Sequence, residues 1–252
     1  MADKEDALLK KRFLELAEIC YQRDIPSHTE FLTLNEQTIF QSIRRELPSI
    51  RFVLVGGYES AERKIVCFLP SYEDETVISP ISIIKAEPTS LRFAQPLTHR
   101  DYLGALMNLG IERGLIGDIL MNETGCFIFC LDKMADYIVS EWNKVAHTPI
   151  TCEIITDPTF DINPHYEEIS GSVASARLDN LVSLVFKISR TKAVSYIEDE
   201  KVFIDGKMVH SPGTQLKTGE IVSVRGLGKF LYTGIQTETK KGRLFVTVKK
   251  YS

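Results

Sequence analysis

Apolar residues recur at helical spacing over the first part of the chain. Phe13, Leu16 and their apolar neighbours would share one face of an amphipathic helix. A second helix is expected further on, with Asn35 as its N-cap. Residues 51–70 have the pattern of two strands joined by a Gly-containing turn. The pattern predicts a small N-terminal α+β region over residues 1–76.

In the next segment, residues 77–158, the sequence pattern predicts a strand, a helix, two strands, a helix and a last strand, in that order. Residues 81–88 are typical of a strand and residues 99–110 of an amphipathic helix, and a turn is expected at residues 122–125. This order is that of the split βαβ, or ferredoxin-like, plait. Many RNA-binding modules have this fold, but so do many unrelated proteins. The middle domain is therefore predicted to be an α-β plait similar to an RNA recognition motif.

One predicted strand of the plait is apolar on both faces. Phe127 and Phe129 alternate with Cys126, Ile128 and Cys130. RNA recognition motifs expose aromatic side chains on the central strands for base stacking. The full aromatic and basic pattern of those motifs is absent here. Which face of this strand meets the helices therefore stays open at the level of sequence.

The last third of the chain is predicted to be a separate domain. The stretch at residues 158–175 is rich in Pro, Gly and Ser and lacks periodicity, and residues 159–171 within it are predicted to form a linker. Residues 172–252 then predict a short amphipathic helix, a second helix capped by Ser189, and a strand–turn–strand unit over residues 201–209. The chain as a whole is predicted to be an α+β protein of three domains.

Charge is distributed unevenly along the chain. Residues 172–252 hold 14 Lys and Arg against 7 Asp and Glu, whereas residues 1–171 hold 16 against 27. A basic domain on an acidic body suggests an anionic partner for the basic end.

The predicted helix after Ser189 strengthens that suggestion. Arg190 and Lys192 lie in its first turn, where cations oppose the helix dipole. An anion bound at the helix N-terminus would offset this cost. These two residues are therefore candidate phosphate ligands.

Composition excludes several other classes of protein. Five cysteines without a CxxC pair argue against a disulfide framework and a zinc site, so no metal or cofactor is predicted. No apolar run is long enough to span a membrane, and the first residues lack the apolar core of a signal peptide. A cytoplasmic protein is expected.

An ordered set of short motifs in the last third resembles the S-four RNA-binding domain, named for small-subunit ribosomal protein four. The resemblance covers about 55 residues. Its elements are RLD at residues 177–179, SRTKA at 189–193, IDGK at 204–207, Pro212, and GEIVSVRG at 219–226.

In that family, two helices and the first hairpin form an L-shaped surface, the αL motif, for structured RNA. The resemblance implies phosphate contacts at Arg177, Ser189, Arg190, Lys192 and Lys207. A local ion pair between Arg177 and Asp179 is an alternative role for that arginine. The family usually has Gly after the second helix, and Glu200 stands there in this chain.

The stretch SVRGLGKF at residues 223–230 is predicted to turn into a last hairpin. Gly226 and Gly228 permit the bend, and the spacing does not match a nucleotide-binding loop. We expect the turn to carry Arg225 and Lys229 to the basic face as further phosphate contacts.

Residues 98–120 followed by this C-terminal domain resemble YlmH-type RNA-binding proteins of bacteria and plastids, often encoded near cell-division genes in bacteria. The resemblance implies RNA binding, with rRNA or tRNA on the large ribosomal subunit as partner. Related small S-four proteins act in quality control of stalled ribosomes that carry peptidyl-tRNA. No catalytic residue is predicted.

Two other functions stay open at this point. A protein-interaction factor linked to cell division would bind its partner through acidic residues 1–171. An RNA-modifying enzyme is disfavoured because synthetase and methyltransferase motifs are absent, and HRD at residues 99–101 lacks the other kinase motifs.

Overall fold

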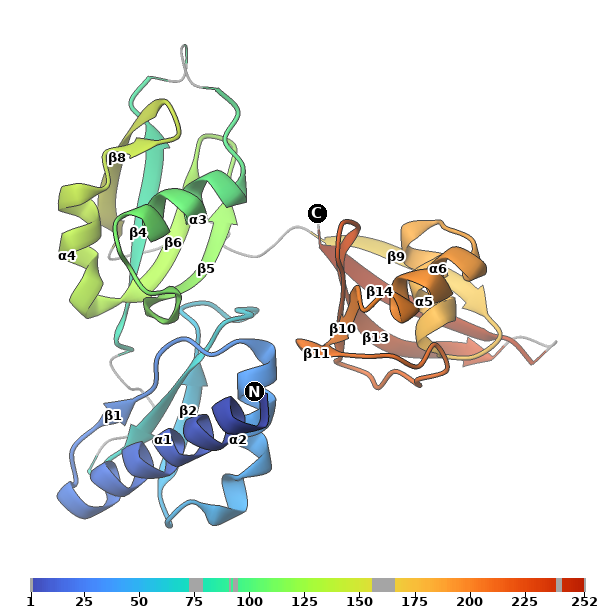
Figure 1. Cartoon of the computed structure of the whole chain (residues 1–252), viewed down its shortest axis with the longest axis horizontal. Helices are drawn as coiled ribbons and strands as arrows, with labels where there is room; N and C mark the ends of the chain where they lie inside the picture. The colour runs from blue at the N-terminus through green and yellow to red at the C-terminus, as the bar shows by residue number, and fades with distance from the viewer. Residues whose placement is uncertain are drawn as a thin grey trace. The chain divides into compact units, whose positions relative to one another are not determined.

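The computed structural model describes residues 2–72, 79–90, 92, 95–155, 166–238 and 242–251. The chain divides into two compact units, Met1–Asn163 and Pro164–Ser252 (Figure 1). Both units combine helices with antiparallel sheets, which confirms the α+β class.

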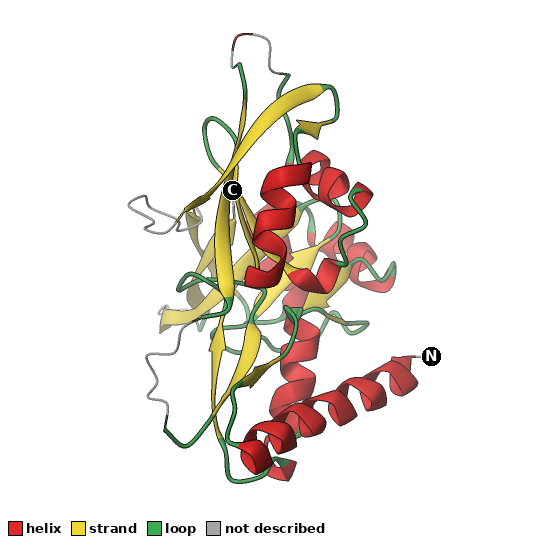
Figure 2. Ribbon diagram, turned by 90° about the vertical axis from the view of Figure 1, so that its left-hand side faces the viewer, coloured by secondary structure: helices red, strands yellow, loops and turns green. Residues whose placement is uncertain are grey.

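The first part of unit 1 packs two helices on a three-stranded sheet of order β1-β3-β2. Its core contains Phe13, Phe40 and Phe68, whose rings meet edge to face. Helix α1 begins near the end marked N in Figure 2. The elements are α1 (Ala2–Arg23), β1 (Ser27–His28), α2 (Leu34–Ser42), a 3-10 turn (Arg44–Glu46), β2 (Arg51–Val55) and β3 (Ile65–Leu69).

The N-cap of α2 differs from the prediction. Thr33, rather than Asn35, caps the helix, and Asn35 is its second residue. The Glu36 carboxylate accepts from the Thr33 N–H at 2.6 Å, and Thr33 Oγ1 accepts from the Glu36 N–H at 3.3 Å. This reciprocal capping box satisfies two backbone donors, which a cap at Asn35 would not do.

The second part of unit 1 is the predicted plait. Its sheet has the order β5-β6-β4-β8-β7, and neighbouring strands are antiparallel. Helices α3 and α4 cover one face through Tyr102, Leu106 and Ile138. The elements are β4 (Ile81–Pro88), α3 (His99–Asn108), a 3-10 turn (Arg113–Leu115), β5 (Ile116–Met121), β6 (Cys126–Leu131), α4 (Asp132–Glu141), β7 (Lys144–Val145) and β8 (Thr148–Ile155).

Strand β6 is buried on both faces, and the structure shows what covers each one. Cys126, Ile128 and Cys130 face the helices of the plait. Phe127 and Phe129 pack instead in a second cluster with residues of β3. The face on which an RNA recognition motif would stack bases is therefore part of a protein core.

This second cluster joins the two predicted N-terminal domains. Ile65, Cys67 and Leu69 of β3 share it with the β6 aromatics, and residues 1–163 form one compact unit. The sequence pattern predicted separate domains over residues 1–76 and 77–158, whereas the structure packs the two segments against each other. The physical reason is that β6 is apolar on both faces and therefore needs a cover on each. The boundary at residues 76 and 77 lies outside the described residues.

Polar contacts join the same two parts. The Asp118 carboxylate of β5 accepts from the Tyr58 hydroxyl and from the Glu62 N–H, both at 2.7 Å. The Arg63 guanidinium donates to the carbonyl oxygens of Ile116 and Phe31. Burial lowers the pKa of Arg63, although nearby carboxylates oppose the shift. These partly buried polar groups have partners, so they do not oppose the packing of the two sheets.

Unit 2 packs two helices on one face of a six-stranded sheet of order β11-β10-β12-β13-β14-β9. Its core includes Leu181, Val185, Val222, Phe230 and Val248. The elements are β9 (Tyr166–Val173), α5 (Leu178–Phe186), α6 (Arg190–Glu198), β10 (Val202–Ile204), β11 (Lys207–Met208), β12 (Ile221–Val224), β13 (Gly228–Glu238) and β14 (Leu244–Tyr251).

The predicted linker is partly a strand. Residues 166–171 belong to β9, which pairs antiparallel with β14 along its whole length. The rest of the linker, residues 159–165, lies outside the described residues. The Gly and Ser content of β9 obscured its alternation, and its partner strand is at the other end of the domain. Local pattern could not predict that pairing.

Glu200 adopts the left-handed backbone conformation, with φ of 58°. It ends α6 in a Schellman motif, in which the Lys201 N–H donates to the Tyr196 carbonyl and the Glu200 N–H to the Ile197 carbonyl. Glycine is the favoured residue at this position. The geometry therefore explains why the family usually has Gly here.

We expect Glu200→Gly to raise the free energy of unfolding by about 0.5–1 kcal/mol, because it removes left-handed strain. Urea denaturation of the full chain measures the change. Glu198→Gly, in the last turn of α6, is the matched control and should lower stability instead. A loss of stability in Glu200→Gly would contradict the expectation.

Candidate nucleic-acid interface

Helix α6 begins as predicted, at the cap residue Ser189. Its hydroxyl oxygen accepts from the Lys192 N–H at 3.2 Å. The side chains of Arg190 and Lys192 are exposed in the first turn, and no acidic residue lies in that turn. The helix start is thus a positive terminus that carries two further cations.

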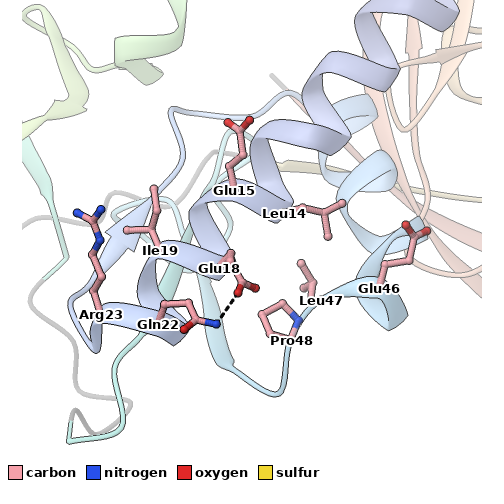
Figure 3. Close-up of a pocket in the computed structure, with 9 residues that line it drawn as sticks. All are labelled: Leu14, Glu15, Glu18, Ile19, Gln22, Arg23, Glu46, Leu47 and Pro48. Carbon is pink, nitrogen blue, oxygen red and sulfur yellow. Dashed lines mark hydrogen bonds between the residues drawn. The ribbon is translucent and has the colours of Figure 1, made fainter.

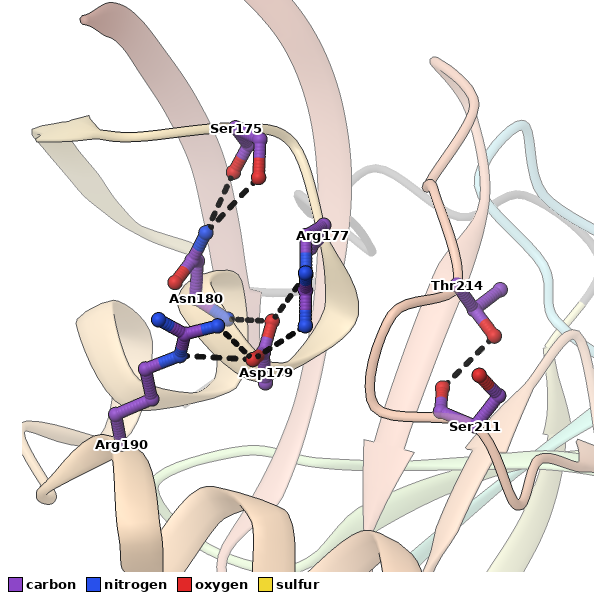
Figure 4. Close-up of polar contacts among 7 residues, drawn as sticks. All are labelled: Ser175, Arg177, Asp179, Asn180, Arg190, Ser211 and Thr214. Atoms are coloured by element: carbon purple, nitrogen blue, oxygen red, sulfur yellow. Dashed lines mark hydrogen bonds and ion pairs between the residues drawn. The ribbon is translucent and has the colours of Figure 1, made fainter.

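A buried carboxylate organises the neighbouring arginines. Asp179 is only 1% exposed. It accepts from Arg177 Nε at 3.2 Å and Nη2 at 3.1 Å, and from Arg190 Nε at 2.8 Å (Figure 4). The Asn180 N–H donates to the same carboxylate at 3.0 Å. Asp179 therefore ties the starts of α5 and α6 together.

The ion pair between Arg177 and Asp179, which the sequence analysis gave as an alternative role for Arg177, is present. Arg190 also pairs with Asp179. Burial alone would raise the pKa of Asp179, but hydrogen bonds from Arg190 and Arg177 outweigh it, so this pKa is lowered. The two arginine side chains remain 36% and 58% exposed. A structural role and a role in anion binding are therefore compatible for both.

The loop that contains the motif residue Pro212 lies beside Arg177. The Leu178 N–H donates to the Thr214 carbonyl at 2.8 Å, and the Asp179 N–H to the Pro212 carbonyl at 3.2 Å. Thr214 Oγ1 donates to the Ser211 carbonyl at 2.8 Å and closes the loop (Figure 4). The motif residue Pro212 thus helps to hold the start of α5.

The remaining predicted contacts do not all share this surface. Lys207 is exposed in the β10–β11 hairpin, whose predicted turn is present, with left-handed backbone at Asp205 and Gly206. Residues 225–227 form the predicted turn between β12 and β13. Lys229 follows it but points away from the helices, because its neighbour Phe230 is fully buried beneath α5.

Arg225 also lies on the side away from the helices. Its guanidinium carbon is 4.8 Å from the ring centre of Phe203, and Lys229 Nζ is 4.4 Å from that of Tyr251. The expectation that the turn carries Arg225 and Lys229 to the same basic face as α6 is therefore wrong. Side chains alternate along a strand, so the burial of Phe230 under the helices turns Lys229 to the opposite side of the sheet.

All five cysteines are thiols, of which Cys20, Cys67, Cys126 and Cys130 are buried and Cys152 is partly buried. Burial raises the pKa of Cys130 and of Cys152 to about 12, so both thiols are protonated at neutral pH. Within the described residues, no cluster of three or more His, Cys, Asp or Glu could hold a metal ion. None of the described helices is long and apolar enough to cross a membrane.

A surface groove in unit 1 has a different character. Leu14 and Ile19 of α1 line it with Leu47 and Pro48, and three carboxylates and one guanidinium also border it: Glu15, Glu18, Glu46 and Arg23 (Figure 3). The side chain of Gln22 donates to Glu18 at 2.7 Å. Carboxylates at this density repel a phosphate backbone, so the groove does not suit RNA.

Comparison with known proteins identifies both middle and C-terminal domains. The family model described as "Putative RNA-binding domain in YlmH" matches residues 83–157, and the S4 domain, the S-four domain named above, matches residues 176–222. The Ribosome-associated protein quality control protein P2 of Bacillus subtilis is 27% identical over 98% of this chain and 96% of its own. The solved Cell division protein ylmH from Streptococcus pneumoniae is 23% identical, covers 60% of this chain and 91% of its own, and has a TM-score of 0.49. The chain therefore carries the YlmH-type RNA-binding domain in its middle and an S4 domain at its C-terminal end.

Proposed function

We propose that the protein is a non-catalytic RNA-binding protein whose S4 domain recognises structured RNA. The observation that carries the proposal is the pair of partly exposed guanidinium groups, Arg177 at the start of α5 and Arg190 at the start of α6, that Asp179 holds together. Ser189 and Lys192 lie at the same helix start, and Lys207, exposed in the β10–β11 hairpin, is proposed as a further phosphate contact. Guanidinium groups held in place by a carboxylate are suited to contact phosphates without further ordering.

We further propose that the RNA is rRNA or tRNA on the large ribosomal subunit, and that the protein acts in the cytoplasm in quality control of stalled peptidyl-tRNA complexes. The support is the name of the Bacillus subtilis relative, to which this chain is similar over nearly its full length.

Sedimentation of cell lysate through a sucrose gradient tests the proposal. The wild-type protein is expected with large subunits at low salt, and Lys192→Glu should move it to the top of the gradient. Lys192 is the better position for charge reversal because it is exposed, whereas Arg190 is bound to the buried Asp179. A carboxylate at position 190 would unfold the site as well as repel RNA.

Lys133→Glu is the matched control, since Lys133 is an exposed residue in the first turn of α4 in the other unit. It should sediment as wild type does. Wild-type protein only at the top of the gradient, at low salt as well, would contradict the ribosomal role. Binding by phosphate contacts also predicts that affinity falls steeply with salt, and that Lys192→Glu lowers the salt slope by about 1.

The acidic groove on α1 favours a second candidate function, the binding of a protein partner by the N-terminal unit. Its apolar lining beside carboxylates would suit a partner with a basic, apolar segment. A cellular phenotype that survives the loss of RNA affinity in Lys192→Glu would favour this function. An enzymatic role is tested by mass analysis of RNA incubated with the protein, in which no change is expected.

A further inference from the structure

The six-stranded sheet of unit 2 has one face that points away from α5 and α6. Figure 1 shows both helices against the opposite face. On β13, Phe230 and Tyr232 are buried toward the helices, so Lys229 and Leu231 point to the other side. We call this second surface, with the side chains it carries, the open face.

A row of side chains crosses five strands of the open face. Phe203 of β10 pairs with Ser223 of β12, and Ser223 pairs with Lys229 of β13. Lys229 Nζ lies 4.4 Å from the ring centre of Tyr251 on β14. Tyr251 pairs with Tyr166 on β9, and their rings are 5.0 Å apart at 73°. The row therefore holds three aromatic rings together with a serine and a lysine.

Cations lie over these rings. Arg225 stacks on Phe203 at 4.8 Å, and Lys249 Nζ is 5.6 Å from the ring centre of Tyr166. Glu168 on β9 lies opposite Lys249 and brings a carboxylate to the same face. Arg225, Lys229 and Lys249 bring three cations to the row.

We propose that the open face binds an unpaired segment of RNA. Tyr166, Tyr251 and Phe203 would stack against bases, while Arg225, Lys229 and Lys249 would contact the phosphates between them. Aromatic rings interleaved with cations on adjacent strands are suited to single strands, whose bases are available for stacking. Double-stranded RNA offers no such bases, so the rings would have no role in binding it.

This surface is distinct from the one formed by Asp179 and its arginines. It therefore adds a second RNA contact to the domain and uses different residues from those of the proposed function. It also gives Arg225 and Lys229 a role that the helix surface cannot, since neither lies on it. A structured RNA with an unpaired extension would engage both surfaces of the domain.

Fluorescence anisotropy of the full chain with a labelled oligouridylate of about 12 nucleotides tests the proposal. Wild type should bind at low salt. The double variant Tyr166→Ala, Tyr251→Ala should lose about tenfold or more in affinity, because stacking on aromatic rings is lost. The matched variant Tyr166→Phe, Tyr251→Phe keeps the rings and should bind within about twofold of wild type. If the alanine double variant does not fold, Lys229→Ala provides the test instead, and it should also weaken binding of oligouridylate.

Lys192→Glu separates this proposal from the proposed function. It should lose affinity for structured RNA and retain affinity for oligouridylate. Wild type that binds structured RNA but not oligouridylate would overturn the open-face proposal and leave the proposed function standing. Equal oligouridylate affinity of the folded alanine double variant and wild type would also overturn it. Displacement by polyglutamate as effective as by oligouridylate would identify an acidic-peptide site instead.

Discussion

Phe129→Ala is expected to lower the free energy of unfolding by about 3–5 kcal/mol, because it leaves a large cavity between two sheets. Phe129 is fully buried, and its ring centre lies 4.9 Å from that of Tyr58. A Cβ atom at Gly57 would come within 2.4 Å of the same ring, so this ring packs directly against the N-terminal backbone. Urea denaturation of the full chain measures the loss.

The same variant distinguishes a core residue from a base-stacking residue. RNA affinity of the folded Phe129→Ala protein should equal that of wild type, because the ring is covered by β3 and the residues around it. Tyr21→Ala is the control, since Tyr21 on α1 is 52% exposed and its loss should cost less than about 1 kcal/mol. Unchanged stability together with weaker RNA binding would show that this face of the plait is open in solution.

Asp179→Asn is expected to lower the free energy of unfolding by about 2–3 kcal/mol. Breaking a buried ion pair commonly costs about 3–5 kcal/mol, and the partial exposure of Arg177 and Arg190 reduces this cost. We also expect affinity for structured RNA to fall about tenfold, because the two guanidinium groups lose the carboxylate that orders them. The substitution removes a negative charge, and this alone would strengthen binding to RNA. A loss of RNA affinity would therefore come from the disordered guanidinium groups and not from the change in net charge.

Asp199→Asn is the matched control for this experiment. It removes the same charge from the same domain, but Asp199 is exposed and pairs with Lys201 at the surface, at 2.9 Å. Its loss should cost about 0.2–1 kcal/mol and leave RNA affinity within about twofold. Equal effects of the two substitutions would contradict the organising role of Asp179.

The pH dependence gives a further check on Asp179. Its pKa is lowered in the folded protein by the two arginines, despite burial. The stabilising contribution is therefore complete above the ordinary aspartate pKa of about 4 and is lost as the pH falls through the lower folded value. The stability difference between wild type and Asp179→Asn should be constant from about pH 5 to 8 and shrink below about pH 4.

Sequence alone determined the features that depend on neighbouring residues. The cap at Ser189, the Asp205-Gly206 turn and the strand and helix order of the plait are all present. Each is governed by interactions within a few residues or by apolar periodicity, which can be read directly from the chain. The family motifs of the S4 domain likewise lie in short segments.

Tertiary structure decided the features that depend on distant partners. Phe129 is a core residue because β3 covers it, Asp179 binds Arg190 across eleven positions, and β9 exists because β14 pairs with it. Lys229 lies apart from α6 because Phe230 is buried under α5. Apolar periodicity shows that a face is buried, but what covers the face, and which charges then meet, is determined only when the whole chain packs.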